Sequence, residues 1–293
     1  MDSKNKLLLV VNPISGGSEK ETLIQEIKKE LDHYNVALQT YRTTGSDDDH
    51  KIRKIIDAKA ITKVLVAGGD GTIQIVAKAI KERDVAVALI PAGSANGLAS
   101  NFNLPNTVAA QVDIAMGTHF IMMDMLSIND HLSLHIADIG INAALIENYE
   151  NSAIRGKLGY ALQTIPTLLA SDLPYDFSIA LNGKTIKIKG VMIAIANANQ
   201  FGTGAIINPD GEMDDGQFEV LIFKNLGVYD ILKTLNKTSK RDPDFVESYA
   251  TKKALITCDK EVSFQVDGEY IGNVKEVFAE LLSSKLKIMI PKT

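Results

Sequence analysis

Three short glycine-rich segments hold most of the residues of this sequence that could do chemistry. They are Asn12-Pro13-Ile14-Ser15-Gly16-Gly17, Gly68-Gly69-Asp70-Gly71-Thr72 and Pro91-Ala92-Gly93-Ser94-Ala95-Asn96-Gly97. Each follows an apolar run that is typical of a buried strand. Carboxyl ends of parallel strands meet at one sheet edge, where glycines admit a ligand and helix N-termini attract phosphate. Together the segments predict a nucleotide site, although any one alone could simply close a strand–helix turn.

The elements that must position these segments alternate up to about residue 125. Apolar runs predict strands at 7–11, 36–41, 64–66 and 85–90. Helical spacing predicts a first helix opened by the capping box Ser18-Glu19-Lys20-Glu21, and two more at 49–58 and 72–82. Strand–helix alternation of this kind predicts right-handed βαβ units and a mainly parallel sheet.

The rest of the chain has mostly strand character. Asn182-Gly183 lies between alternating runs and predicts a tight hairpin. Further strands are expected at 133–139, 191–196, 218–223, 254–257 and 262–266, with helices at 158–169 and 228–235. Many strands with few helices favour a sandwich or barrel. A last strand is expected at 285–291, and periodicity does not decide which domain it joins.

Composition narrows the function classes. The 293 residues favour two domains, and the formal net charge of −5 argues against general nucleic-acid binding. The single cysteine, Cys258, excludes an intramolecular disulfide and fits a reducing compartment. No apolar run approaches the ~20 residues of a transmembrane helix, so we expect a soluble cytoplasmic protein. Neither the P-loop pattern nor the dinucleotide-binding glycine pattern is present.

The glycine segments are identified with a known family by their sequences. Gly68–Thr72 resembles the signature of the diacylglycerol kinase and sphingosine kinase catalytic domain, shared more distantly with NAD kinases and phosphofructokinases. The segments at 12–17 and 91–96 resemble the opening and third motifs of that family. Later similarities follow in family order and cover nearly the whole chain, closest to small bacterial lipid kinases. They are Gly156–Tyr160, Asn197, Gly202, Gly204, Pro209, Asp215-Gly216 and Asp267-Gly268-Glu269.

The resemblance implies an architecture and an activity. It implies a phosphofructokinase/NAD-kinase-like α/β domain of residues 1–124 plus 279–293, a β-sandwich domain of residues 125–278, and an active site in the cleft between them. It implies an ATP- and Mg²⁺-dependent lipid kinase that meets its lipid at the membrane surface. A homodimer and attachment to the inner face of the membrane stay open. The alternatives are a related kinase with a soluble acceptor such as NAD, and a nucleotide-binding regulator without turnover.

The resemblance also assigns roles at the nucleotide site. Asp70 would hold Mg²⁺ at the ATP phosphates, although an aspartate there could also cap the following helix. Thr72 and Ser94 would donate to phosphate or only cap helices, and Asn12 would contact the nucleotide or only form a turn. The full set of expected nucleotide-binding residues is Asn12, Ser15, Gly16, Thr43, Gly68, Gly69, Asp70, Gly71, Thr72, Gly93, Ser94 and Asn96.

Two further acidic groups are expected to be functional. Glu269 is the candidate general base for the acceptor hydroxyl, with Asp267 beside it as a second catalytic carboxylate. From the residues alone, Asp267-Gly268 also reads as a hairpin turn. Asp215 resembles the ligand of a structural magnesium, completed by backbone carbonyls near Glu212 and Gln217, although a solvated acidic loop is the alternative.

Two positions depart from the family pattern, and one acidic run is interpreted from its charge alone. Bacterial diacylglycerol kinases usually have Asn-Asp where this chain has Asn96-Gly97. Many lipid kinases also have an acidic residue shortly after the Gly-Asp-Gly-Thr motif, where this chain has Gln74 and Ile75. Both departures argue against diacylglycerol as the acceptor. The run Asp47-Asp48-Asp49 is expected to be a solvated helix start.

Overall fold

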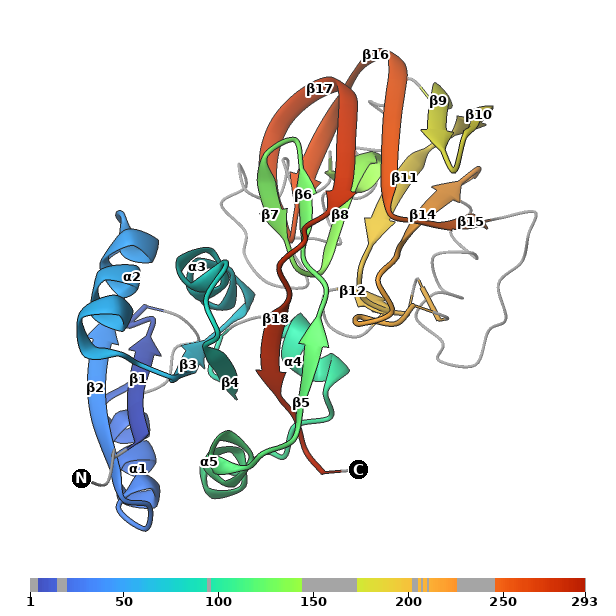
Figure 1. Cartoon of the computed structure of the whole chain (residues 1–293). Coiled ribbons are helices and arrows are strands. Elements are labelled where there is room, and N and C mark those ends of the chain that lie inside the picture. The colour runs from blue at the N-terminus through green and yellow to red at the C-terminus, as the bar shows by residue number, and fades with distance from the viewer. Residues whose placement is uncertain are drawn as a thin grey trace. The chain divides into compact units, whose positions relative to one another are not determined.

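A computed structural model describes residues 5–14, 20–93, 96–143, 173–201, 205–206, 208–209, 211–225 and 246–292 (Figure 1). The chain divides into two compact units: Met1–Met123 with Ser283–Thr293, and Asp124–Leu282. The helices predicted at 158–169 and 228–235 lie outside the described residues, as do Ser18 and Glu19 of the predicted capping box. No helix of the described ranges is long and apolar enough to cross a membrane.

The first unit is built on a six-stranded sheet, which confirms the predicted α/β fold. Its strand order is β2-β1-β3-β4-β18-β5; the first five strands run parallel and β5 pairs antiparallel with β18. The strands are β1 (Asn5–Val11), β2 (Val36–Arg42), β3 (Lys63–Gly68), β4 (Ala86–Pro91), β5 (Phe120–Met123) and β18 (Leu286–Met289). The helices are α1 (Lys20–Leu31), α2 (Asp48–Lys59), α3 (Asp70–Ile80), α4 (Gly97–Asn101) and α5 (Val108–Met116).

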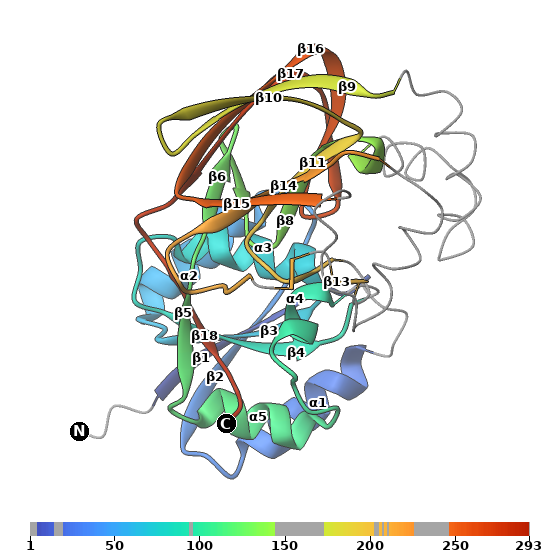
Figure 2. The same ribbon diagram turned by 90° about the vertical axis from the view of Figure 1, so that its right-hand side faces the viewer.

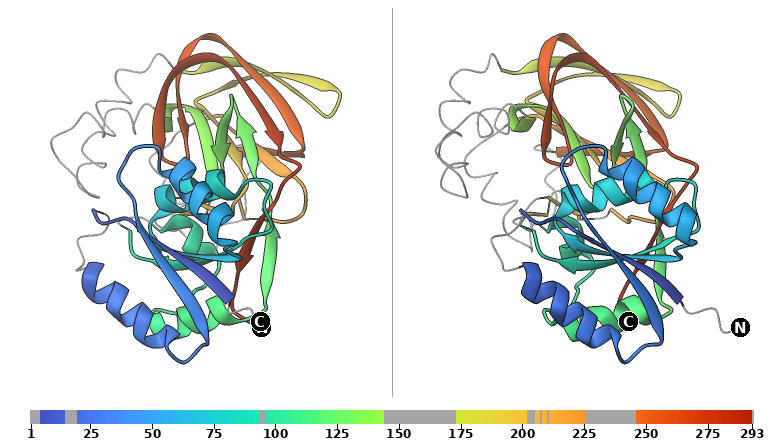
Figure 3. Two further views of the ribbon diagram at one scale, coloured as in Figure 1. Left: turned by 60° about the vertical axis from the view of Figure 1, so that its left-hand side comes forward. Right: turned by 90° about the vertical axis from the view of Figure 1, so that its left-hand side faces the viewer.

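Helices cover both faces of this sheet. Helices α1 and α5 lie on one face and α2 and α3 on the other (Figure 3). Leu7, Leu9 and Val11 of β1 pack in one core with Ile27 of α1 and Val112 of α5. Because β1 is buried on both faces, its sequence is a continuous apolar run rather than an alternating one.

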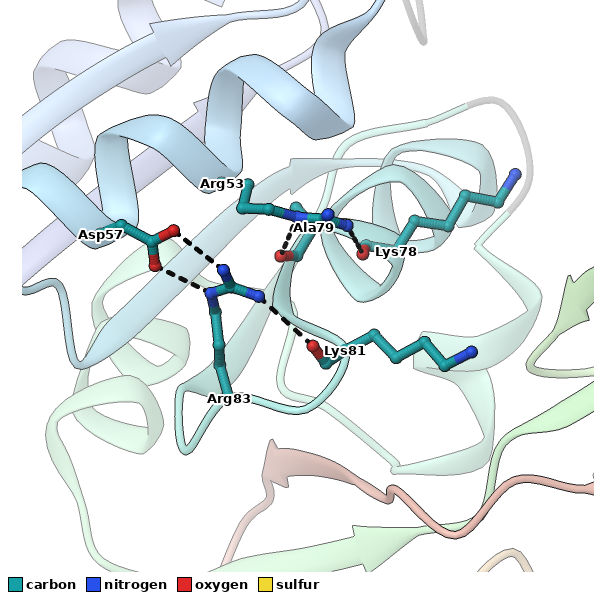
Figure 4. Close-up of polar contacts among 6 residues, drawn as sticks. All are labelled: Arg53, Asp57, Lys78, Ala79, Lys81 and Arg83. Carbon is teal, nitrogen blue, oxygen red and sulfur yellow. Dashed lines mark hydrogen bonds and ion pairs between the residues drawn. The ribbon is translucent and has the colours of Figure 1, made fainter.

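Helix α3 begins at Asp70 and ends at Ile80, two residues earlier at each end than the predicted 72–82. Figure 4 shows how its last turn is held. Arg53 of α2 donates to the carbonyl oxygen of Ala79 at 3.3 Å. Arg83, just beyond the helix, forms two 2.8 Å hydrogen bonds with the Asp57 carboxylate of α2. Since the last carbonyls of a helix have no partner within it, Arg53 supplies one, while Arg83 ties the residues after the helix to α2. Together they hold the C-terminal end of α3, whose N-terminal end carries the second glycine segment.

The second unit contains a ten-stranded antiparallel sheet, and it confirms the predicted β-sandwich class. The strands from β6 to β11 are β6 (Leu126–Ile128), β7 (His131–Ser133), β8 (Ile136–Gly140), β9 (Tyr175–Leu181), β10 (Lys184–Gly190) and β11 (Met192–Ala196). The later strands are β14 (Phe218–Phe223), β15 (Val246–Thr251), β16 (Lys253–Val266) and β17 (Glu269–Leu281). A separate pair consists of β12 (Gln200–Phe201) and β13 (Ala205–Ile206).

The hairpin predicted at Asn182-Gly183 is confirmed. Strands β9 and β10 pair antiparallel around it and form the yellow ribbon pair in Figure 2. Asn182 and Gly183 have φ values of 49° and 73°, the left-handed backbone that this two-residue turn requires.

Two strand predictions in this unit were wrong in extent. The single strand expected at 133–139 is two strands, β7 and β8, because the chain bends at Leu134 and His135 around the carboxylate of Asp267. The two strands expected at 254–257 and 262–266 are one long strand, β16. Its pairing with β17 is irregular between Thr257 and Val262, which explains the break in the apolar alternation there.

Candidate functional site

The segments that follow four strands lie side by side at the carboxyl edge of the first unit's sheet. The Asn12 amide donates to the carbonyl of Ala67 at 3.3 Å, and the Ala92 amide donates to the carbonyl of Gly68 at 3.1 Å. On the other side, the Thr43 amide donates to the carbonyl of Val11 at 2.9 Å. The chain winds from β1 to β2 in one direction and from β3 to β4 in the other. This edge is therefore a topological switch point, where open α/β sheets bind ligands.

The second glycine segment needs its first glycine for packing. A Cβ atom at Gly68 would lie 2.4 Å from the Thr72 hydroxyl oxygen. Thr72 is buried over that glycine in the first turn of α3. The N-cap residue of α3 is Gly69, which has no side chain, and the helix has no side-chain cap. Thr72 lies inside the first turn and does not cap it. The predicted capping role of Thr72 is therefore wrong, whereas its contact with phosphate stays a prediction.

Asp70 connects the second segment to the third. Its Oδ2 accepts the Gly97 amide at 2.8 Å, and its Oδ1 accepts the Leu98 amide at 3.0 Å. The carboxylate therefore satisfies amides at the start of α4, not of α3, and the alternative that it caps the helix it belongs to is wrong. Each carboxylate oxygen keeps a second lone pair for a further partner.

The amide side chains of the first and third segments stabilise their own loops. The Asn12 Oδ1 accepts the Ile14 amide at 3.1 Å, which confirms the turn role. The Asn96 side chain accepts the Gly93 amide at 3.0 Å and donates to the Gly93 carbonyl at 3.1 Å. Ser15, Gly16 and Ser94, all expected at the nucleotide, lie outside the described residues. Nucleotide contact by Asn12, Thr43, Gly71, Gly93 and Asn96 stays a prediction.

Lys20 is a residue of this edge that the sequence patterns did not single out. Its side chain is 7% exposed, and its Nζ donates to the Ala92 carbonyl at 2.6 Å. Burial lowers the pKa of this ammonium. Lys20 thus ties the start of α1 to the third glycine segment. Nothing in the sequence around Lys20 indicates this contact, because a lysine in a capping box is ordinarily expected to be solvated.

In the second unit, Asp267 and Gly268 form the turn between β16 and β17. Their φ values are 50° and 90°, so the hairpin interpretation is confirmed. The Asp267 carboxylate accepts four donors, and all of them belong to the bend between β7 and β8. They are the Ser133 hydroxyl (2.8 Å) and the amides of Leu134 (2.8 Å), His135 (3.0 Å) and Ile136 (3.1 Å). Burial raises the pKa of the Asp267 carboxyl, and these donors oppose that shift.

Glu269 occupies a different environment from Asp267. It is exposed and begins β17 opposite Val266. The two carboxylates were expected to act together, but the turn separates them: one is engaged with the bend and the other faces solvent. We therefore interpret Asp267 as the residue that holds the turn, and Glu269 as the one free to meet a substrate.

The loop expected to bind a structural magnesium is organised by a buried acid that the motifs did not reveal. Asp124 is 2% exposed, and its Oδ2 accepts the Gly216 amide at 2.7 Å. The exposed Asp215 accepts the Gln217 amide at 2.9 Å, and Glu212 is exposed. Carboxylate and carbonyl oxygens are the ligands that Mg²⁺ prefers, so this donor set fits that ion. A metal at Asp215 stays a prediction.

The acidic run at the start of α2 was expected to be solvated, but the structure buries one of its three residues. Asp48 is 4% exposed and accepts the amides of Thr44 (2.9 Å) and Gly45 (2.8 Å) and the Tyr41 hydroxyl. Burial and this hydrogen bond raise the pKa of Tyr41 to about 12. Asp47 and Asp49, with His50, form the one cluster of three potential metal-binding side chains in the described ranges.

The buried carboxyl of Asp138, on β8, should make the stability of the protein depend on pH. Burial raises the pKa of this carboxyl to about 7, although hydrogen bonds from Gln265 and Asn142 oppose the shift. The native state therefore keeps a proton that the unfolded chain releases near pH 4, and stability falls as pH rises from there to about 7. Relative to Asp138→Asn, the wild type should lose about 3 kcal/mol between about pH 5 and about pH 8. Chemical denaturation of both proteins at each pH measures this; parallel pH profiles would contradict it.

Two family descriptions match the chain. "Diacylglycerol kinase catalytic domain" matches residues 6–128, and "YegS C-terminal NAD kinase beta sandwich-like domain" matches residues 136–290. The first match covers most of the α/β unit and the second most of the β-sandwich unit, and the second also includes residues 283–290, which return to the α/β unit.

Individual proteins are similar over nearly the full length. A protein from Enterobacter sp. (strain 638) named probable lipid kinase YegS-like is 25% identical, covering 89% of this chain and 88% of its own. A diacylglycerol kinase from Staphylococcus carnosus (strain TM300) is 21% identical, covering 99% and 96%. The crystal structure of a diacylglycerol kinase from Bacillus anthracis str. Sterne superposes with a TM-score of 0.77 at 18% identity, covering 99% and 98%. An NAD kinase from Archaeoglobus fulgidus in complex with ATP superposes with a TM-score of 0.53 at 13% identity, covering 97% and 93%.

Proposed function

Because the chain belongs to the diacylglycerol kinase catalytic-domain family, we propose that it transfers the γ-phosphoryl group of ATP to a hydroxyl of a lipid. The names of its relatives support a lipid acceptor. We propose further that the acceptor lies at the membrane surface and that the protein acts in the cytoplasm, at the inner face. Gly97 and Ile75, which depart from the usual diacylglycerol kinase pattern, leave a lipid other than diacylglycerol open.

The observation that carries this proposal is the position of Asp70 at the carboxyl edge of the sheet. There it joins the second and third glycine segments through the amides of Gly97 and Leu98. Gly69, the N-cap residue of α3, has no side chain that could cap the amides of the first turn. A carboxylate beside helix-start amides that no N-cap side chain occupies suits the phosphates of a metal-bound nucleotide.

The roles of the chain's own residues follow from this arrangement. Mg²⁺, when bound, would neutralise charge that develops on the transferred phosphoryl group, and the carboxylate oxygens of Asp70 would hold it through their remaining lone pairs. The amides at the start of α3 would position the phosphates. Glu269, exposed beside a fixed turn, would accept the proton of the lipid hydroxyl as the new bond forms.

The experiment that tests the proposal measures transfer of label from γ-labelled ATP. Purified protein with Mg²⁺ is incubated with mixed micelles that contain glycerolipids or sphingoid lipids, and separately with NAD. Labelled lipid supports the proposal. Label on NAD alone would replace the lipid with a soluble acceptor, and ATP binding without transfer to either would indicate a regulator without turnover.

Asp70→Asn is expected to lower lipid labelling by about 10²-fold, because it removes one charged oxygen at the point where phosphoryl charge develops. Asp84→Asn is the matched control. It makes the same change at an exposed acid of the same unit, which forms an ion pair with Lys287. Equal labelling by the two variants would remove Asp70 from the site.

A further inference from the structure

The turn that carries Glu269 is held from a second side, by a buried pair that the reaction does not itself use. Gln265, on β16, is fully buried at 0% exposure, and Asp138, on β8, is 1% exposed. Their strands pair antiparallel, with Gln265 directly opposite Asp138. Buried amide and carboxyl groups are costly unless their hydrogen bonds are satisfied. The burial of these two polar side chains therefore needs a structural or functional explanation.

The contacts of Gln265 lead directly to the turn. Its Oε1 accepts the Gly268 amide at 2.7 Å. A backbone amide can only donate, so this contact fixes the orientation of the side chain and leaves Nε2 as the donor toward Asp138. The Asp138 Oδ2 accepts that hydrogen bond, and it also accepts the Asn142 side-chain amide at 2.6 Å. A continuous chain of hydrogen bonds thus runs from Asp138 through Gln265 to Gly268.

This chain of hydrogen bonds complements the one made by Asp267. The Asp267 carboxylate fixes the first residue of the turn to the β7–β8 bend, and Gln265 fixes the second. Glu269 comes next in the chain, so both contacts limit where its backbone can lie. A general base must stay within hydrogen-bond reach of the proton that it accepts, and a displacement of about 1 Å can cost about 10²-fold in rate.

We propose that Gln265 and Asp138 are positioning residues for Glu269: together they hold the Gly268 amide, and so the turn, in the geometry that phosphoryl transfer needs. This inference rests on the proposed function for its catalytic meaning. The contacts themselves do not depend on it. Asp138 acts only through Gln265, and what it must supply is an oxygen that accepts a hydrogen bond.

The test combines kinetics with a measurement that needs no substrate. Gln265→Leu should lower kcat by about tenfold with little change in the KM for ATP, because the turn loosens while the nucleotide site is untouched. Asp138→Leu should do the same, whereas Asp138→Asn, which keeps an acceptor oxygen, should stay within about twofold of wild type. Gln111→Leu, the same change at a buried glutamine of the other unit, is the matched control.

Amide hydrogen exchange of isotope-labelled glycine gives the independent readout. The Gly268 amide should exchange about tenfold faster or more in Gln265→Leu and Asp138→Leu, because its buried acceptor is lost or loosened. It should stay protected in Asp138→Asn and Gln111→Leu, and the Gly183 amide of the other hairpin should not change in any variant. This arm contains neither ATP nor lipid, so it tests whether the pair holds the turn even if the wild type labels no lipid. An unchanged Gly268 amide in Gln265→Leu, or a kcat for it equal to that of Gln111→Leu, would overturn the proposal.

Discussion

Glu269→Gln is expected to lower kcat for phosphoryl transfer by about 10²- to 10⁴-fold, the usual contribution of a general base. The amide has nearly the same shape as the carboxylate but cannot accept the hydroxyl proton. The side chain is exposed on the first residue of β17, so its replacement removes no buried contact. We therefore expect the melting temperature and ATP affinity to stay at their wild-type values. The measurement is initial-rate kinetics with the labelled lipid, beside thermal denaturation.

The control for this variant is Glu276→Gln, which makes the same change at an exposed position of the same strand. It should keep wild-type kinetics. If Glu269→Gln retained more than about a tenth of the wild-type kcat, the exposed carboxylate would not be the base. The acceptor proton would then have to leave to solvent or to another group.

Local patterns predicted the elements of this fold well because their signals lie within a few residues of each other. The Asn182-Gly183 turn needs two residues that tolerate positive φ, and the sequence shows both. The buried β1 strand needs only a continuous apolar run between Leu7 and Val11. The glycine segment at Gly68 is likewise local, since its reason is the Thr72 side chain four residues later.

The bend between β7 and β8 could not be predicted in this way. Residues 133–139 have the apolar character of one strand, and the cause of the break is Asp267, which lies 131 to 134 residues further along the chain. Period-two alternation contains no information about a carboxylate that arrives from another hairpin. A turn aspartate indicates a turn in sequence, and only the fold shows which backbone it serves.

The candidate site shows the same division. The glycine segments and Asp70 were visible as motifs, but the partner of Asp70 is the start of α4, 27 residues away. Lys20 reaches Ala92 across 72 residues, and Asp124 reaches Gly216 across 92. The family motifs therefore pointed to the chemistry, whereas the residues that hold the motifs in place had no sequence signal of their own.

Asp267→Ala is expected to lower both stability and activity, in contrast to Glu269→Gln. The change leaves the Ser133 hydroxyl and three backbone amides of the β7–β8 bend without their common acceptor. A buried donor without a partner costs about 1–3 kcal/mol, and water can reach only some of these groups, so we expect a loss of about 3 kcal/mol or more. Activity should fall even well below the melting temperature, because the turn before Glu269 loses its anchor.

The matched control separates this loss from backbone strain. Asp130 occupies another tight turn, between β6 and β7, with φ of 65° against 50° at Asp267, but its side chain is exposed. Asp130→Ala therefore carries the same cost of placing alanine at positive φ without removing a shared acceptor. The difference in unfolding free energy between the two variants measures the four hydrogen bonds of Asp267. If the two variants were equally stable and equally active, the carboxylate at Asp267 would contribute only its tolerance of the turn, and its contacts with the bend would have no energetic weight.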